Sequence, residues 1–250
     1  MGLVIEDMPE LGVVRVSRWI FNCYLIRTDG GAIVVDPGLP HVADDLAALV
    51  DDVEGGLLAI VATHGHSDHV AGAAKLAERY RAPIYLPAVT LTYLDGVRPR
   101  IPRPIPAARI WPAMVGQPFD RVGAMGALSG WRRAGYVTST GMRWSGPPPD
   151  GALTDEQPVP GASGWSVVST PGHSDDSISL WNDATGTLLS GDAVLSVRGR
   201  VWHTPGVVDT ASAGSTRRRL EQLPVRNLLP GHGLPVHSDA EVWARQRNSA

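Results

Sequence analysis

The chain has 250 residues, of which 43% are apolar and 19% charged, as in an ordinary folded globular protein. The net charge of −3 gives no electrostatic reason to expect nucleic acid or a membrane surface as a partner. No apolar run approaches the roughly 20 residues that cross a bilayer, and the N-terminus shows no secretory signal, so we expect a cytoplasmic protein. The single cysteine, Cys23, excludes an intramolecular disulfide, and its apolar neighbours favour a buried thiol over a catalytic one.

The first third of the chain predicts short strands and helices in alternation. Asp29-Gly30-Gly31 is a hairpin signal between two apolar segments, and Val42–Val50 has the apolar spacing of a helix. The remaining predicted elements are the strands Leu11–Val16, Cys23–Ile26, Ala32–Val35 and Leu57–Ala62 and a helix Val70–Arg81. Such alternation of strand and helix is typical of layered α/β folds.

The middle of the chain, residues 87–161, has a different character. Twelve of the 21 prolines lie between Pro87 and Gly164, and this density argues against continuous helix or central sheet. The segment also contains Trp111, Trp131 and Trp144. A flexible tether is one interpretation, but three large aromatic side chains favour packing against the rest of the molecule. We therefore predict one domain over residues 1–250, with residues 87–161 as an insertion or lid near the active site and a tryptophan in the substrate pocket.

The last third again predicts strands followed by helices. The strands are Trp165–Ser169, Ser177–Trp181, Thr187–Ser190 and Asn227–Leu229, and the helices are Ser212–Gln222 and Asp239–Arg247. The two ends of the chain thus share a pattern of strands, polar loop and helix.

The strongest feature is the segment Thr63-His64-Gly65-His66-Ser67-Asp68-His69, between a predicted strand and a predicted helix. Four potential ligands within six residues can converge on one or two ions. Neutral imidazoles suit Zn²⁺ or Fe²⁺, and a carboxylate suits a site that also holds water. The alternative is a polar helix start with Asp68 as its N-cap and solvated histidines.

The order of these and later motifs resembles the metallo-β-lactamase superfamily. The signature His-x-His-x-Asp-His stands at positions 64–69. The other matching segments are Val35-Asp36-Pro37-Gly38, Thr170-Pro171-Gly172-His173-Ser174, Ser190-Gly191-Asp192 and Leu229-Pro230-Gly231-His232-Gly233. This resemblance implies a four-layer αβ/βα sandwich with a two-metal site at one edge.

The resemblance also implies a role for each matching residue. His64, His66 and His173 would hold a first metal ion; Asp68, His69 and His232 would hold a second, and Asp192 would bridge the two. Asp36 would support the first histidine loop, although a plain turn residue is the alternative. Of the histidines outside the motifs, His41 and His237 fit helix starts or the surface, and His203 either faces substrate or is structural.

A histidine at position 69 together with Asp192 is similar to the glyoxalase II, lactonase and ribonuclease Z-like branches. These imply hydrolysis of a small ester, thioester or lactone by a hydroxide shared between two metal ions, most plausibly Zn²⁺, with Fe or Mn as alternatives. Asp68 would act as the catalytic carboxylate that orients the hydroxide and moves its proton. The segment Ser174-Asp175-Asp176-Ser177 departs from the family pattern. Its two extra carboxylates either support the metal ligands or face solvent, and they leave the substrate open.

Two other functions remain open at this point. Persulfide dioxygenases share the fold and much of the signature but use a single iron, and a non-catalytic metal-binding module is a further alternative. The absence of an evident basic extension argues against nucleic acid as substrate. The sequence gives no indication of an oligomeric state.

Overall fold

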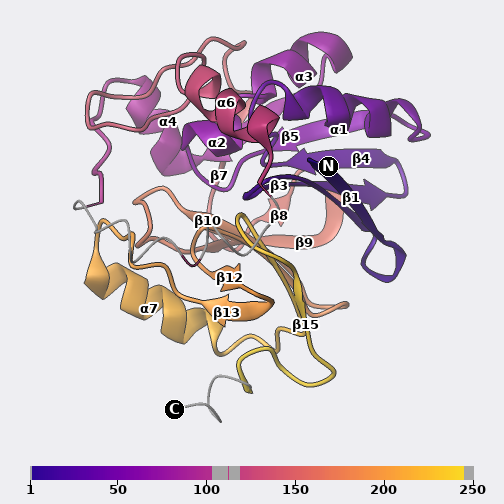
Figure 1. Cartoon of the computed structure of the whole chain (residues 1–250), viewed down its shortest axis with the longest axis vertical. Helices are drawn as coiled ribbons and strands as arrows, with labels where there is room; N and C mark the ends of the chain where they lie inside the picture. The colour runs from indigo at the N-terminus through magenta and orange to yellow at the C-terminus, as the bar shows by residue number, and fades with distance from the viewer. Residues whose placement is uncertain (1, 103–111, 113–118, 245–250) are drawn as a thin grey trace.

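The computed structural model describes residues 2–102, 112 and 119–244. Two β-sheets lie face to face, and helices cover the outer face of each (Figure 1). Helices α1 (Val42–Asp51) and α3 (Ala73–Tyr80) lie over the first sheet, and α7 (Thr210–Leu220) lies over the second. The predicted four-layer αβ/βα sandwich is therefore confirmed.

The first sheet combines an antiparallel half and a parallel half. Its strands follow the chain order from β1 to β7; β1 to β4 are antiparallel, whereas β4 to β7 are parallel. The strands are β1 (Leu3–Met8), β2 (Val13–Arg18), β3 (Phe21–Thr28), β4 (Gly31–Val35), β5 (Leu57–Val61), β6 (Ile84–Pro87) and β7 (Gly151–Leu153). Helix α1 connects β4 to β5, as a parallel pair requires.

The second sheet has the strand order β15-β14-β11-β10-β9-β8. Its strands are β8 (Pro158–Val159), β9 (Ala162–Ser169), β10 (Ile178–Asn182), β11 (Thr187–Gly191), β14 (Asn227–Pro230) and β15 (Val236–His237). A separate hairpin, β12 (Leu195–Val197) and β13 (Arg200–Trp202), follows β11, and α7 connects this hairpin to β14. The pair β11 and β14 is parallel, so both strands end at the same edge of the sheet.

Side chains that alternate along the strands fill three apolar layers. In β3, Cys23 and Leu25 face the layer under α1 and α3, whereas Tyr24 and Ile26 face the layer between the sheets. In β11, Leu188 faces the third apolar layer, which also contains Leu220 of α7. This alternation is the period of a strand whose two faces are both covered. It explains why the strands are apolar on both faces.

Several predicted boundaries are wrong. The helix predicted from Val70 begins earlier and is divided into α2 (Ser67–Val70) and α3, so Asp68 and His69 lie in a helical turn. Leu11 belongs to a short 3-10 helix, η1 (Pro9–Leu11), and the strand β1 before it was not predicted. In the predicted C-terminal helix, residues 239–243 form bends and turns, and residues 245–247 lie outside the described residues.

The segment 87–161 contains more regular structure than its prolines predict. It includes α4 (Ala88–Leu94), α6 (Arg121–Gly130) and strand β7, which extends the first sheet. Trp144 packs on the apolar layer under α1 and α3, and its indole donates to the carbonyl of Pro147 at 2.7 Å. Trp131 is largely exposed, and Trp111 lies outside the described residues. Within the described chain, we find no helix with the length and apolarity that a membrane span needs.

Candidate metal centre

The candidate ligands lie in loops that follow four strands. Residues 63–69 follow β5 and run into α2, the loop after β9 carries His173, Asp192 directly follows β11, and His232 lies two residues after β14. The structure brings all seven predicted side chains together in two adjacent groups. One group contains His64, His66, His173 and Asp192, the other contains Asp68, His69 and His232, and the ligand atoms within each group lie within 4.8 Å of one another.

Asp192 lies between the two groups. Its Oδ2 is 3.3 Å from Nε2 of His173 and 3.3 Å from Nε2 of His232. Its Oδ1 is 3.6 Å from Nε2 of His69. The carboxylate therefore faces histidines of both groups, as a bridging position requires. In the second group, Oδ2 of Asp68 is 3.4 Å from Nε2 of His232.

The ring orientation of four histidines is fixed by contacts on the side away from the centre. Nδ1 of His173 contacts the carbonyl oxygen of Gly206 at 2.8 Å, and Nδ1 of His232 contacts that of Ile20 at 2.8 Å. Nδ1 of His69 contacts Asp36, and Nδ1 of His64 contacts the hydroxyl of Thr63. Carbonyl and carboxylate partners require Nδ1 to carry a proton, so Nε2 of these rings faces inward and can bind a metal ion once any proton on it has been displaced. His66 instead presents Nδ1, which is 2.8 Å from Nε2 of His64.

Asp36 supports the first histidine loop, as predicted. Its carboxylate accepts hydrogen bonds from the amide of Thr63 at 2.7 Å and from the Thr63 hydroxyl at 2.8 Å, and it lies 2.8 Å from Nδ1 of His69. The residue follows β4 with a φ of 51°, which non-glycine residues rarely adopt. These contacts explain why a carboxylate, and not a plain turn residue, occupies this strand end.

Two buried polar atoms test whether the centre fits metal ions. Nε2 of His69 and Oδ1 of Asp192 have no hydrogen-bond partner among the described residues, although both side chains are buried. An unsatisfied buried polar atom is costly, and a divalent cation between these atoms would remove that cost. The glycine at position 231 leaves room for the Asp192 carboxylate and the His69 ring to lie this close to the backbone. A Cβ at this position would stand 2.5 Å from Oδ1 of Asp192 and 2.9 Å from Cε1 of His69. The residues present therefore fit a metal site.

The charges of the centre also favour a cation between His69 and Asp192. Burial lowers the pKa of His69, but the carboxylates of Asp36 and Asp192 outweigh it and raise this pKa to about 9. Burial raises the pKa of Asp192, yet His232 and His69 hold it well below its usual range. Burial and the neighbouring His173 lower the pKa of His66 to about 4. His66 is therefore neutral, and the carboxylates carry negative charge that a divalent ion can balance in place of protons.

A buried network around Asp176 ties residues 87–161 to this centre, and the sequence did not indicate its partners Thr90 and Tyr136. Asp176 is 2% exposed and accepts hydrogen bonds from the amide of Gly65 at 2.8 Å, the hydroxyl of Thr90 at 2.7 Å and the hydroxyl of Tyr136 at 2.6 Å. The Tyr136 amide donates to the Gly65 carbonyl at 3.0 Å, and its ring centroid is 4.7 Å from that of His66. Residues 87–161 thus reach the centre through Tyr136, and Asp176 holds the loop between His64 and His66.

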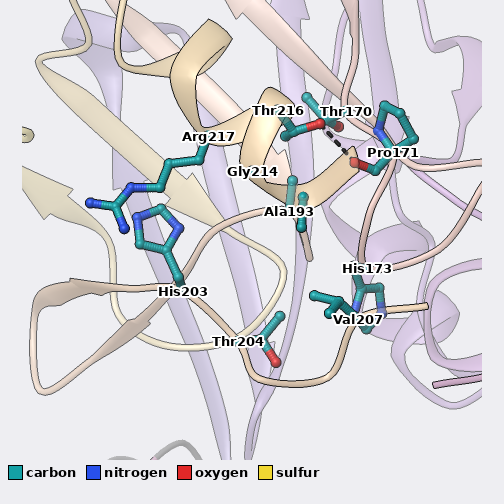
Figure 2. Close-up of a pocket in the computed structure, with 11 residues that line it drawn as sticks. Thr170, Pro171, His173, Ala193, His203, Thr204, Val207, Gly214, Thr216 and Arg217 are labelled. Atoms are coloured by element: carbon teal, nitrogen blue, oxygen red, sulfur yellow. Dashed lines mark hydrogen bonds between the residues drawn. The ribbon is translucent and has the colours of Figure 1, made fainter. Parts of the chain in front are cut away.

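The other residues noted in the sequence have separate surroundings. Asp175 forms an ion pair with Arg100 on the surface. His41 precedes α1 and packs against Gly126 of α6, and His237 is exposed in β15, where it contacts Asn227. His203 lines a cavity that His173 also lines (Figure 2).

Comparison with known proteins identifies the family. The family model described as Metallo-beta-lactamase superfamily matches residues 18–232. The chain belongs to the metallo-β-lactamase superfamily. Within it, the chain is 27% identical over 245 residues to a Bacillus subtilis (strain 168) protein named "Probable metallo-hydrolase YflN", which covers 90% of this chain and 85% of that protein.

Two further superfamily relatives bear on the centre. The crystal structure of TTHA1623 in a di-iron-bound form matches with a TM-score of 0.59 and 26% identity, over 92% of this chain and 96% of that one. A hydroxyacylglutathione hydrolase from Halorhodospira halophila is 44% identical over 57 residues, which is 23% of this chain and 21% of that protein. The family match and the metallo-hydrolase relative place the chain in a superfamily of metallo-hydrolases, and the cluster of histidines and aspartates is a candidate metal site.

Proposed function

We propose that this protein is a hydrolase that binds two divalent metal ions, with Zn²⁺ as the expected metal, and cleaves a small ester, thioester or lactone. The observation that carries the proposal is the convergence of seven side chains, six of them around Asp192, with histidine rings oriented by contacts on their outer side. The two groups of ligand atoms match two ions, and a single iron would leave one group unused. The short match to a hydroxyacylglutathione hydrolase favours acyl substrates, in agreement with the glyoxalase II and lactonase-like branch.

The ligand assignment follows the two groups. His64, His66 and His173 would hold one ion, Asp68, His69 and His232 would hold the other, and Asp192 would contact both. Metal ions in such a centre polarise a carbonyl oxygen and lower the pKa of bound water toward neutrality.

Asp68 is the carboxylate best placed to move a proton. Its side chain is 24% exposed, compared with 5% for Asp192, so it faces the open side of the centre. Contact with His232 orients it. In the proposed reaction, a water oxygen forms a bond to the acyl carbon and the bond to the leaving oxygen or sulfur breaks. Asp68 accepts the proton of the water and returns it to the leaving group, and no serine or cysteine nucleophile is needed.

The experiment is metal analysis combined with a substrate panel. Protein purified without added zinc is analysed for its elements and assayed on thioesters, lactones, aryl esters and phosphodiesters with Zn²⁺, Mn²⁺ and Fe²⁺. We expect two metal ions per chain and turnover of at least one acyl substrate. One iron per chain together with sulfite production from a persulfide would contradict the hydrolase proposal and identify a persulfide dioxygenase. No turnover of any acyl substrate in fully loaded protein would reject it.

A further inference from the structure

A cavity of about 160 Å³ lies beside the metal centre. It is bounded by α7, by the loop that carries His173 and by segment 203–207. His173, which belongs to the centre, forms part of its wall. Figure 2 shows His173 and Val207 toward one end and His203 and Arg217 toward the other. The cavity thus extends from the metal centre toward a positively charged side chain.

The size of the cavity limits what it can hold. An engineered protein cavity of roughly 150 Å³ binds benzene, so this volume suits about six non-hydrogen atoms. Pro171, Ala193 and Val207 contribute apolar wall, and the hydroxyl of Thr216 already donates to the carbonyl of Pro171 at 2.7 Å. The middle of the cavity therefore suits methylene groups.

The far end of the cavity suits an anion. Arg217 donates its Nε to Glu221 at 2.7 Å, and its side chain is 51% exposed. A guanidinium has five N–H donors, so its two terminal nitrogens can still bind a carboxylate in a bidentate manner. His203 also lines the cavity toward this end (Figure 2).

We infer that this cavity binds a short acyl arm that ends in a carboxylate, with the scissile carbonyl near His173 and the carboxylate at Arg217. Three methylene groups and a carboxylate contain six non-hydrogen atoms, which is the capacity of the cavity. The substrate class is accordingly a glutaryl-type ester or thioester. This inference rests on the proposed function, because it assigns the acyl side of the same hydrolysis.

The test compares two acyl arms of equal size on the leaving group that proves active in the substrate panel. One arm is glutaryl, and the other is 5-methylhexanoyl, in which an isopropyl group replaces the carboxylate. We expect Arg217→Gln to lower kcat/KM for the glutaryl substrate by at least about tenfold, mainly through KM, because it removes a charged hydrogen bond. For the 5-methylhexanoyl substrate the change should stay within about twofold.

Two further variants control the experiment. Arg218→Gln changes the next residue of α7, which donates to Ser215 and does not line the cavity, and both arms should react as in the wild type. Val207→Phe should narrow the cavity and slow both six-atom arms while an acetyl substrate reacts normally. Titration calorimetry of the purified protein with glutarate and 5-methylhexanoate should show tighter glutarate binding, and Arg217→Gln should remove that difference.

The outcomes separate this inference from the proposed function. If Arg217→Gln affects both arms equally, or the acetyl substrate is cleaved while glutaryl is not, the cavity assignment is wrong and the hydrolase assignment stands. If no acyl substrate is cleaved at all, the hydrolase proposal itself fails and the cavity assignment fails with it.

Discussion

At the scale of single residues, Asp192 is the side chain that both halves of the centre share. Its two oxygens face His173, His232 and His69 at 3.3 to 3.6 Å. We expect Asp192→Ala to reduce the metal content to at most one ion per chain, because two cations would then face each other with less compensating charge. Hydrolysis should fall by at least about a hundredfold, as for the loss of one electrostatic partner in an active site.

Elemental analysis and steady-state kinetics of the purified Asp192→Ala variant check this prediction. Asp183→Ala removes an exposed carboxylate in the turn after β10 and should retain metal and activity. Two ions per chain and normal turnover in Asp192→Ala would show that the central position of this carboxylate is unrelated to metal binding.

Asp36 acts on the centre through His69. Asn at this position offers one acceptor oxygen in place of two, so the Thr63 amide and Nδ1 of His69, which contact different oxygens of Asp36, cannot both be satisfied. We expect Asp36→Asn to weaken metal binding by roughly 10- to 100-fold, the usual effect of removing a partner that orients a ligand. Competition with a chromogenic chelator measures this affinity. Asp150→Asn is the control, because Asp150 also caps a strand amide, that of Ile84, outside the centre.

The sequence predicted the seven candidate ligands that the structure brings together and left open whether Asp176 supports them or faces solvent, but it gave no sign of Tyr136. The candidate ligands could be found because each stands next to glycine or within a dense histidine motif after an apolar strand. Tyr136 lies 70 positions from His66 in the sequence, and nothing local marks it. Its contact with Asp176 depends on how the insertion packs, which spacing alone does not encode.

At the scale of elements, the strands with strong apolar character were predicted well and the marginal ones were not. β5 and β11 are buried along nearly their whole length, so their composition alone indicates them. β1 is largely exposed at the edge of its sheet, and β8 has two residues. Such edge strands form because a neighbour offers hydrogen bonds, and their sequence carries little signal. The proline density likewise concealed α4 and α6.

Tyr136 and Asp176 connect the insertion to the histidine loop. Tyr136→Phe removes the hydroxyl that donates to Asp176 and leaves a buried carboxylate with one donor fewer. We expect a loss of about 1–3 kcal/mol in the free energy of unfolding, and weaker metal binding because the Gly65 loop is held less firmly. Urea denaturation and chelator competition measure the two effects.

Tyr80→Phe provides a matched control for this effect. The single proton of the Tyr80 hydroxyl is also used within the fold, where the carbonyl of Ala47 lies at 2.8 Å and Asp51 at 2.7 Å. These contacts join helices α1 and α3, which carry none of the seven candidate ligands. Tyr80→Phe should reduce stability without a change in metal affinity. Equal effects of both variants on metal affinity would contradict a specific link between the insertion and the centre.

At the scale of the whole molecule, the centre joins the two halves of the sandwich. The segment 64–69 follows a strand of the first sheet, whereas His173, Asp192 and His232 follow strands of the second. Tyr24 and Asn22 of β3 donate across this boundary to the Pro230 carbonyl at 2.7 and 2.9 Å. Metal ions between these loops would therefore strengthen the contact between the halves.

Removal of metal is consequently expected to destabilise the entire fold. A ligand present at about a thousand times its dissociation constant stabilises the native state by about 4 kcal/mol. For a chain of this length, such a change corresponds to roughly 10 °C in Tm. Thermal unfolding before and after treatment with a chelator, followed by re-addition of metal, measures the effect. The Asp192→Ala variant should show a much smaller shift, because it holds less metal at the start. An unchanged Tm in metal-free wild-type protein would mean that the two halves hold together independently of the centre, through the apolar layer and the β3 contacts alone.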